Sequence, residues 1–310
     1  MSFYQFIRKT SYLFVFCILA ISLSGCEKKH EAYVSTSTTI RDNTPVCLVP
    51  QAPGETLYEN EFVSVDASNS AEGYLMIAYL GSNPKVKLQL TGPDYMTYTY
   101  DLSGSNYEAF PLSVGDGVYN VGVYENVADT QYATVFSQDI EVTIKNETGA
   151  FLYPNQYVKF NDSSQVVAKA KELAAPAHDD LEAIIYIYNY IIENFTYDYE
   201  KAENVQSGYI PDVDEILDCK TGICLDYAAV MASMLRSQRI PTKLEVGYAG
   251  DAYHAWISTY VDNIGWIDGI IQFDGVNWSL MDPTFAANTD EKNLKSFIGD
   301  GENYVTKYNY

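Results

Sequence analysis

The chain has 310 residues, of which 41 are acidic and 19 are lysine or arginine, so its formal net charge at pH 7 is −22. Nucleic acid binding depends on a basic surface that contacts phosphates, and this charge argues against that class of protein. Anionic lipid headgroups would also repel the chain, so a covalent lipid would be needed to hold it at a membrane.

The N-terminus is typical of an exported protein. Arg8 and Lys9 precede an apolar run over 11–23, which is shorter than the roughly 20 residues of a transmembrane helix. The run ends in Leu-Ser-Gly-Cys at 23–26, which resembles the lipobox of bacterial lipoproteins. That resemblance implies a signal peptide over 1–25, a diacylglycerol on Cys26 and a protein that faces the extracytoplasmic side of a membrane.

Cleavage before Cys26 would leave 285 residues with 17 basic and 41 acidic side chains, a net charge of −24. This length is enough for two domains, and the polar start of the mature chain predicts a lipidated tether over 26–50. Of the five cysteines, Cys26, Cys47, Cys219 and Cys224 would remain. With Cys26 lipidated, three thiols are left, and an odd number does not form a disulfide framework.

Short alternating runs rich in Val, Ile, Tyr and Thr fill the sequence from 62 to 145. We predict strands at 62–66, 73–80, 86–91, 95–101, 118–125, 132–138 and 139–145. Their spacing and the Gly, Pro, Asn and Asp residues between them predict an antiparallel β-sandwich over 51–148. The segment 116–125 is similar to the penultimate strand of immunoglobulin-like modules. Such a domain would serve as a spacer or would bind glycan or protein.

The hydrophobic period changes to that of a helix after Ala150. Apolar residues recur at spacings of three and four from Leu181 to Phe195, behind a capping aspartate at 179 or 180. We therefore predict a second, α+β domain over 149–310, with a further short segment at 213–217 and a closing helix near 294–298.

One cysteine in this second domain lies at a predicted helix start. Gly222 breaks the chain before Cys224, and apolar residues then follow at positions 228, 231 and 235 up to Ile240-Pro241. A helix N-terminus stabilises a thiolate, which is the nucleophilic form of cysteine. A thiolate also needs a general acid to protonate a leaving amine.

His254 and Asp282 are the candidate partners of this cysteine. His254 begins a strand-like run over 253–261, whereas His30 lies in the predicted tether and His178 just before a helix. Asp282 ends another short strand, directly before Pro283. A carboxylate fixes the tautomer of an imidazole and stabilises its protonated form.

These three segments together, TGICLDYAAVMASMLRSQRIP, YHAWISTYV and WSLMDPTF, resemble the transglutaminase-like superfamily in its bacterial exported form. The resemblance covers about 181–285. It implies a papain-like fold, with Cys224 as nucleophile, His254 as general acid/base and Asp282 as the group that orients the imidazole. Tyr197 matches a recurrent upstream aromatic residue and is a candidate oxyanion donor.

Three other roles for Cys224 remain open at this level. It could form a disulfide with Cys219, because five positions of separation permit a loop. It could bind zinc with Cys219 and His254, although that spacing fits no common site. It could also be a small buried hydrophobic residue.

The sequence therefore predicts an exported, lipid-anchored enzyme that acts on protein or peptide amides through a Cys-His-Asp triad, with no cofactor or metal. Either water or an amine would accept the acyl group, and the resemblance favours water slightly. The alternative is a cell-surface binding or scaffold protein without catalysis, in which the β-sandwich binds glycan or protein.

Overall fold

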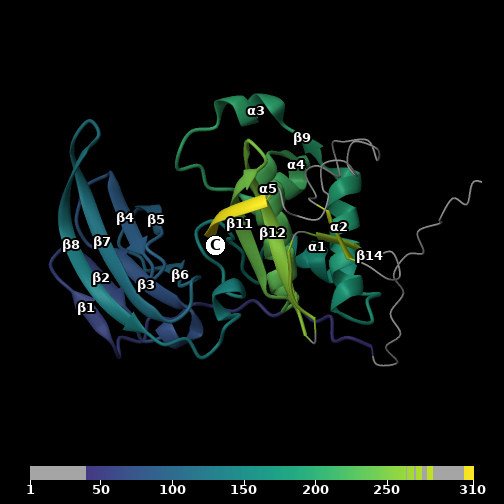
Figure 1. The fold of residues 1–310 in the computed structure, drawn as a ribbon, viewed down its shortest axis with the longest axis horizontal. Coiled ribbons are helices and arrows are strands. Elements are labelled where there is room, and N and C mark those ends of the chain that lie inside the picture. The colour runs from purple at the N-terminus through teal and green to yellow at the C-terminus, as the bar shows by residue number, and fades with distance from the viewer. Residues whose placement is uncertain (1–39, 263, 269, 274–277, 282–303) are drawn as a thin grey trace, which may run out of the picture. The chain divides into compact units, whose positions relative to one another are not determined.

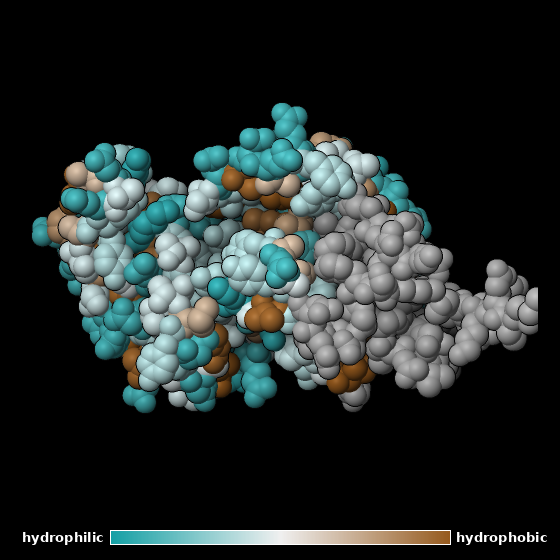
Figure 2. Space-filling model, turned by 45° about the horizontal axis from the view of Figure 1, so that its top comes forward, coloured by the Kyte–Doolittle hydropathy of each residue, from teal (hydrophilic) through white to brown (hydrophobic). Residues whose placement is uncertain are grey.

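The computed structural model describes residues 40–262, 264–268, 270–273, 278–281 and 304–310. These residues form a mixed α+β fold with several antiparallel sheets (Figure 1). None of the helices within these ranges is both long and apolar enough to cross a membrane. On the face seen in Figure 2, hydrophilic residues are spread widely, and small hydrophobic patches lie between them.

Residues 57–142 form two four-stranded antiparallel sheets, with strand orders β1-β2-β3-β6 and β5-β4-β7-β8. The strands are β1 (Leu57–Glu59), β2 (Val63–Asp66), β3 (Tyr74–Tyr79), β4 (Val86–Thr91), β5 (Thr97–Leu102), β6 (Glu108–Pro111), β7 (Gly117–Ala128) and β8 (Gln131–Val142). In β4 every second side chain is buried, as the alternating sequence predicts. The immunoglobulin-like assignment and the boundaries of the sandwich domain stay predictions.

The strand predictions differ from the structure in two respects. The two predicted runs 132–138 and 139–145 merge into one strand, β8, which ends at Val142 and pairs with β7 through two register shifts. The short strands β1 and β6 were not predicted, because three or four residues are too few to show an alternating pattern.

One short 3-10 helix, η1 (Ser70–Glu72), lies between β2 and β3. The other described helices follow Thr148 and are η2 (Gly149–Phe151), α1 (Gln165–Ala174), α2 (Asp180–Asn194), α3 (Tyr199–Asn204), α4 (Val213–Cys219) and α5 (Cys224–Ser237). The helix predicted over 181–195 corresponds to α2, and the Asp179 side chain caps it by accepting from the Glu182 N–H. The sequence did not predict α1.

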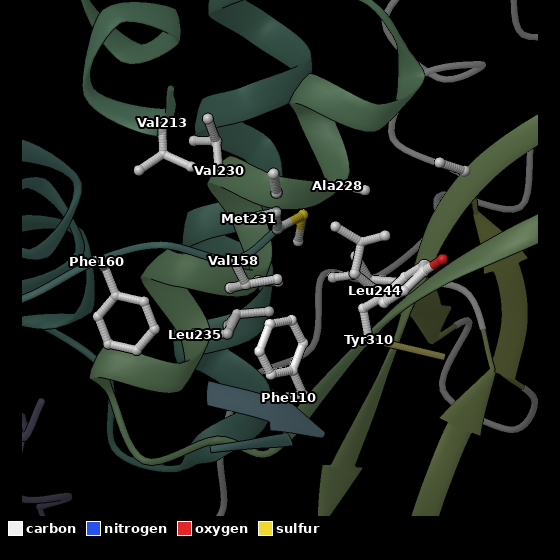
Figure 3. Packing of buried hydrophobic residues seen from close by; sticks show 14 of the residues in the cluster. Phe110, Val158, Phe160, Val213, Ala228, Val230, Met231, Leu235, Leu244 and Tyr310 are labelled. Atoms are coloured by element: carbon white, nitrogen blue, oxygen red, sulfur yellow. The ribbon is translucent and has the colours of Figure 1, made fainter. Parts of the chain in front are cut away.

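Helix α5 lies at the centre of the helical part. Every residue from Asp226 to Ser237 is buried, which is typical of a helix that is enclosed on all sides. It packs against strands of the C-terminal sheet and against α1, α2 and α4. Figure 3 shows Ala228, Met231 and Leu235 of this helix directed into the core that they share with Leu244 and Tyr310.

The C-terminal sheet has the strand order β13-β12-β11-β16. Its strands are β11 (Thr242–Ala249), β12 (Ala252–Val261), β13 (Gly265–Asp268) and β16 (Tyr304–Asn309), and a separate pair is formed by β14 (Ile270–Phe273) and β15 (Trp278–Met281). The predicted run 253–261 corresponds to β12. Strands β11 and β16 were not predicted, and the closing helix expected near 294–298 lies outside the described residues.

Residues 40–50 contain no helix or strand and contact the helical part. The Val46 N–H donates to the Ser237 carbonyl at 2.8 Å. The Arg41 guanidinium donates to Asp180 at 2.6 Å and also to the Gln238 carbonyl. These contacts hold this segment against the C-terminal end of α5 and the first turn of α2.

Arg236, in the last turn of α5, is fully buried and holds four parts of the chain together. Its guanidinium donates to the carbonyl oxygens of Thr242 (2.9 and 2.8 Å) and Tyr153 (2.7 Å) and to the backbone oxygen of Tyr310 (2.6 Å). Burial lowers the pKa of this guanidinium to about 9, so it remains charged at neutral pH. A cation near a helix C-terminus also interacts favourably with the helix dipole.

We expect Arg236→Met to lower the free energy of unfolding in urea by about 3 kcal/mol or more, because three buried carbonyl groups would lose a charged donor. Arg239→Met is the matched control. The Arg239 guanidinium pairs with the exposed carboxylate of Asp42 at 3.2 Å, so its loss should cost less than about 1 kcal/mol. Equal losses in the two variants would contradict this role of Arg236.

Candidate active site

Cys224 is the first residue of α5, as the sequence predicts. The preceding residue, Ile223, is extended (φ −99°, ψ 177°), so the chain turns into the helix at the cysteine itself. Gly222 permits this turn, because a Cβ at that position would lie 2.7 Å from the Asp226 Cβ. The thiol is partly buried, and it lies where the unpaired N–H groups of a helix start stabilise a negative sulfur.

The neighbouring thiols are free. Cys47, Cys219 and Cys224 form no disulfide in the structure. Cys219 is exposed at the end of α4, and its thiol donates to the Thr221 carbonyl at 3.3 Å. Within the described ranges no group of three or more His, Cys, Asp or Glu residues could hold a metal ion. The structure therefore contains neither the Cys219–Cys224 disulfide nor a zinc site with His254.

His254 lies in β12, directly opposite Gly247 of β11. The imidazole is largely buried, with 7% of its surface exposed. The indole of Trp256 lies nearly parallel to it, with ring centroids 6.3 Å apart and an interplanar angle of 24°. Trp256 in turn packs edge-on against Tyr304 of β16, with centroids 5.0 Å apart. Aromatic packing thus restricts the orientation of the His254 ring.

Cys224 and His254 line the same cleft, which has a volume of about 500 Å³. This volume is in the usual range for small-molecule and peptide-side-chain sites. Five tyrosines contribute to its walls: Tyr157, Tyr197, Tyr209, Tyr253 and Tyr310. The lining also includes the segment 205–208 and three apolar side chains, those of Ile223, Leu225 and Val246. The fold therefore brings the predicted nucleophile and the predicted base, 30 residues apart in the chain, to one cavity.

Tyr197 lies beside Cys224 because two short strands join them. Strand β9 (Thr196–Tyr197) pairs in parallel with β10 (Thr221–Gly222), and Gly222 is opposite Tyr197. The backbone N–H of Cys224 is near enough to the Tyr197 phenol to oppose a rise of its pKa. Burial, together with the nearby Cys224, raises the pKa of this phenol to about 12. Tyr197 is therefore a neutral hydroxyl group at the nucleophile in the physiological pH range.

Tyr157 and Tyr310 belong to an aromatic cluster that extends away from the cleft. Their ring centroids are 4.4 Å apart, and Tyr310 packs edge-on against Tyr98 and Tyr100 of β5 at 5.6 and 5.9 Å. Burial raises the pKa of each of these phenols above its ordinary value. This part of the cleft wall is thus fixed by rings from β5, from residues 153–160 and from the C-terminal end.

Asp282, the third predicted member of the triad, lies outside the described residues. Strand β15 ends at Met281, immediately before it. The predicted lipidation site, Cys26, also lies outside them.

A buried carboxylate in the first turn of α5, that of Asp226, was not predicted from the sequence. Asp226, two residues after Cys224, is completely buried and accepts from the Ile223 N–H at 2.9 Å. Its carboxylate also pairs with Lys201 of α3 at 2.6 Å and accepts the Tyr209 hydroxyl at 2.7 Å. An acidic residue near a helix start is a recognisable capping signal, but nothing in the sequence identifies Lys201 or Tyr209 as its partners.

The described fold and cleft can be compared with known proteins. Residues 167–268 match the model of the transglutaminase-like superfamily. This range includes Cys224 and His254.

Two curated proteins are similar to parts of the chain. YebA, an uncharacterized protein of Bacillus subtilis, is 23% identical over 197 residues, and the UPF0252 protein MJ1282 of Methanocaldococcus jannaschii is 26% identical over 143 residues. The matches cover 54% and 42% of this chain, and 26% and 39% of those proteins. The chain thus spans between a quarter and two fifths of the length of these relatives.

A solved structure from Cytophaga hutchinsonii, described as that of a candidate cysteine protease, has a TM-score of 0.38 and 14% identity to this chain. The similarity covers 82% of this chain and 73% of that one. The segment 167–268, which contains α2–α5, Cys224 and His254, is thus the part of the chain that is similar to the transglutaminase-like superfamily.

Proposed function

We propose that this protein is a cysteine acyl-transfer enzyme that acts on amides of proteins or peptides. The observation that carries the proposal is the shared cleft, in which the thiol at the start of α5 and the imidazole of β12 both line one cavity. In the proposed triad Cys224 is the nucleophile, His254 the general acid/base and Asp282 the group that orients the imidazole.

In the first half-reaction the thiolate of Cys224 attacks the carbonyl carbon of the amide, and the electron pair of the C=O bond moves to its oxygen. When the tetrahedral intermediate collapses, the C–N bond breaks and protonated His254 gives its proton to the leaving amine. The products are a thioester on Cys224, a free amine and a neutral imidazole.

In the second half-reaction an acceptor attacks the thioester carbonyl while His254 takes its proton. The C–S bond breaks, and the thiolate of Cys224 is restored. Water as acceptor gives a carboxylic acid, which is the reaction of a peptidase or amidase. A primary amine gives a new amide, which is the reaction of a cross-linking enzyme. We favour water as the acceptor.

Tyr197 is the proposed oxyanion donor. Its phenol lines the cleft together with Cys224 and carries one O–H proton that it can donate to an oxyanion. The developing oxyanion forms next to Cys224, where both the backbone N–H and this hydroxyl are found. Because the pKa of Tyr197 is about 12, the phenol keeps its proton throughout the pH range in which a Cys-His pair operates.

We also propose that the enzyme is exported and anchored by a lipid on Cys26, with the cleft on the extracytoplasmic side. The sequence at 23–26 and the basic and apolar residues before it support this proposal. Its substrates would then be proteins or peptides of the cell envelope or the extracellular space.

Cys224→Ala should reduce turnover at least about a thousandfold, because the nucleophile is lost. We would measure both the hydrolysis of casein and the incorporation of dansylcadaverine, a primary amine, into casein. These two readings also identify the acceptor. Cys219→Ala is the matched control and should keep full activity, since that thiol is exposed and outside the cleft lining. Turnover by Cys224→Ala would refute the assignment of the nucleophile.

His254→Ala should leave the far-ultraviolet circular dichroism spectrum unchanged and abolish formation of the acyl-enzyme, because no group would protonate the leaving amine. The mass of the intact protein after incubation with casein peptides reports the thioester. His178→Ala is the control, because the His178 side chain is half exposed and bonds Glu182 instead. A thioester trapped on Cys224 in the His254 variant would contradict the role of the imidazole.

Cys26→Ser should release the protein from the membrane fraction of the cells that express it, because serine cannot carry the thioether-linked diacylglycerol. Cys17→Ser, within the apolar run of the predicted signal peptide, should stay in the membrane fraction like the unaltered chain. Retention of the Cys26 variant would point to another anchor.

A further inference from the structure

Three side chains close a hydrogen-bonded ring below the first turn of α5. The Lys201 ammonium lies 2.6 Å from one Asp226 oxygen and 2.7 Å from the Tyr209 hydroxyl. The Tyr209 hydroxyl lies 2.7 Å from the other Asp226 oxygen. Each member contacts the other two, and the ring joins α3, the segment after α3 and α5.

Lys201 neutralises the buried carboxylate of Asp226. No surface of Asp226 is exposed, and a buried carboxylate without a cation is strongly disfavoured. Burial alone would lower the pKa of the Lys201 ammonium, but its bonds to Asp226 and Tyr209 outweigh burial and raise it above the ordinary value. Burial, opposed by the bond from Lys201 and reinforced by Asp226, raises the pKa of Tyr209 to about 12. Lys201 is therefore charged and Tyr209 neutral at physiological pH.

Tyr209 brings the ring to the cleft wall, and Asp226 connects it to the start of α5. Asp226 is two residues after Cys224, and the oxygen that pairs with Lys201 also accepts the N–H of Ile223, the residue before the cysteine. Tyr209 follows directly on residues 205–208, and all of them line the cleft together with Cys224. A displacement of Tyr209 would therefore move this wall, and a change of charge at Lys201 or Asp226 would act on the thiol.

We propose that Lys201, Asp226 and Tyr209 form a charge-balanced positioning site, which sets the ionisation of Cys224 and fixes residues 205–208 as one wall of the cleft. Its part in turnover rests on the proposed acyl-transfer function. Its effect on the thiol does not, because an alkylating reagent reads the thiolate without any substrate.

Several groups face the thiol within the described residues. His254 and Tyr253 from β12 and Tyr197 from β9 line the cleft with it, and the buried Asp226, paired with Lys201 of α3, lies in the first turn of its own helix. The phenols carry no charge at neutral pH, because burial raises the pKa of both Tyr197 and Tyr253. The charged pair of the ring and the imidazole are thus the groups whose removal should change the pH profile.

The test is the rate of alkylation of Cys224 by iodoacetamide against pH, read on the isolated peptide. Lys201→Met leaves an uncompensated carboxylate, so the midpoint of the profile should move up by about half to one pH unit. Asp226→Asn leaves an uncompensated ammonium, so the midpoint should move down by a similar amount. The double variant removes both charges and should return close to the unaltered protein.

Opposite shifts are the decisive result, since a merely structural role would move both profiles in the same direction. Shifts of the same sign, or none, in folded variants would overturn the proposal. Lys169→Met is the matched control, because this lysine forms an exposed pair with Glu172 on α1 and should shift nothing. Lys201→Arg keeps the charge and should restore the midpoint.

Tyr209→Phe tests the wall separately. It keeps both charges, so the alkylation midpoint should not move, whereas amide hydrogen exchange over 205–208 should speed up about tenfold or more through the loss of two bonds to charged groups. Unchanged exchange would overturn the positioning of the wall. If Lys201→Met does not fold, two readings still test the proposal. A downward shift of the midpoint in Asp226→Asn and faster exchange over 205–208 in Tyr209→Phe would support it, and the absence of either would contradict it. Absence of casein turnover in the unaltered protein would instead refute the proposed function and leave these readings valid.

Discussion

The burial of α5 is the constraint on which the rest of the structure depends. A helix enclosed from Asp226 to Ser237 needs a partner for each charged group that it buries. Its two charged residues lie at opposite ends. The acid, Asp226, is in the first turn and the base, Arg236, is in the last, which is the arrangement that the helix dipole favours. Lys201 and Tyr209 satisfy the acid, and three backbone oxygens satisfy the base.

This burial also explains how two residues 30 positions apart come to share a cleft. Strand β12 packs directly on α5, and both ends of α5 are bonded to other elements, so the helix cannot slide along the sheet. The strand that carries His254 is held in turn between β11 and β13. The relation between thiol and imidazole is therefore a property of the packed core. A cleft supported in this way depends on the packing of the core as well as on its own lining.

The sequence predicted those features that depend on local pattern. The apolar spacing from Leu181 indicated α2, the glycine before Cys224 indicated the start of α5, and the run from Tyr253 indicated β12. What it did not predict arises from contacts between distant segments. Strand β16 exists because it pairs with β11, some 60 residues earlier. Lys201 and Tyr209 become partners of Asp226 only when the fold brings α3 and the segment after it against α5. Neither the hydrophobic period nor the residue spacing of the sequence indicates this contact.

The net negative charge of the chain affects how easily the Cys224 thiol and the His254 imidazole would become charged. A net charge of −22 produces a background potential that opposes a thiolate and favours an imidazolium. Among the described residues that line the cleft, none is a permanently charged side chain, so the lining itself does not offset that background. In the proposed positioning site, the N–H groups at the start of α5 and the Lys201 ammonium, which balances the buried Asp226, provide the compensation. Long-range repulsion is screened within about 8 Å of water at physiological salt, whereas a buried pair is screened far less. On this proposal the ionisation of Cys224 depends on these few groups more than on the many carboxylates of the surface.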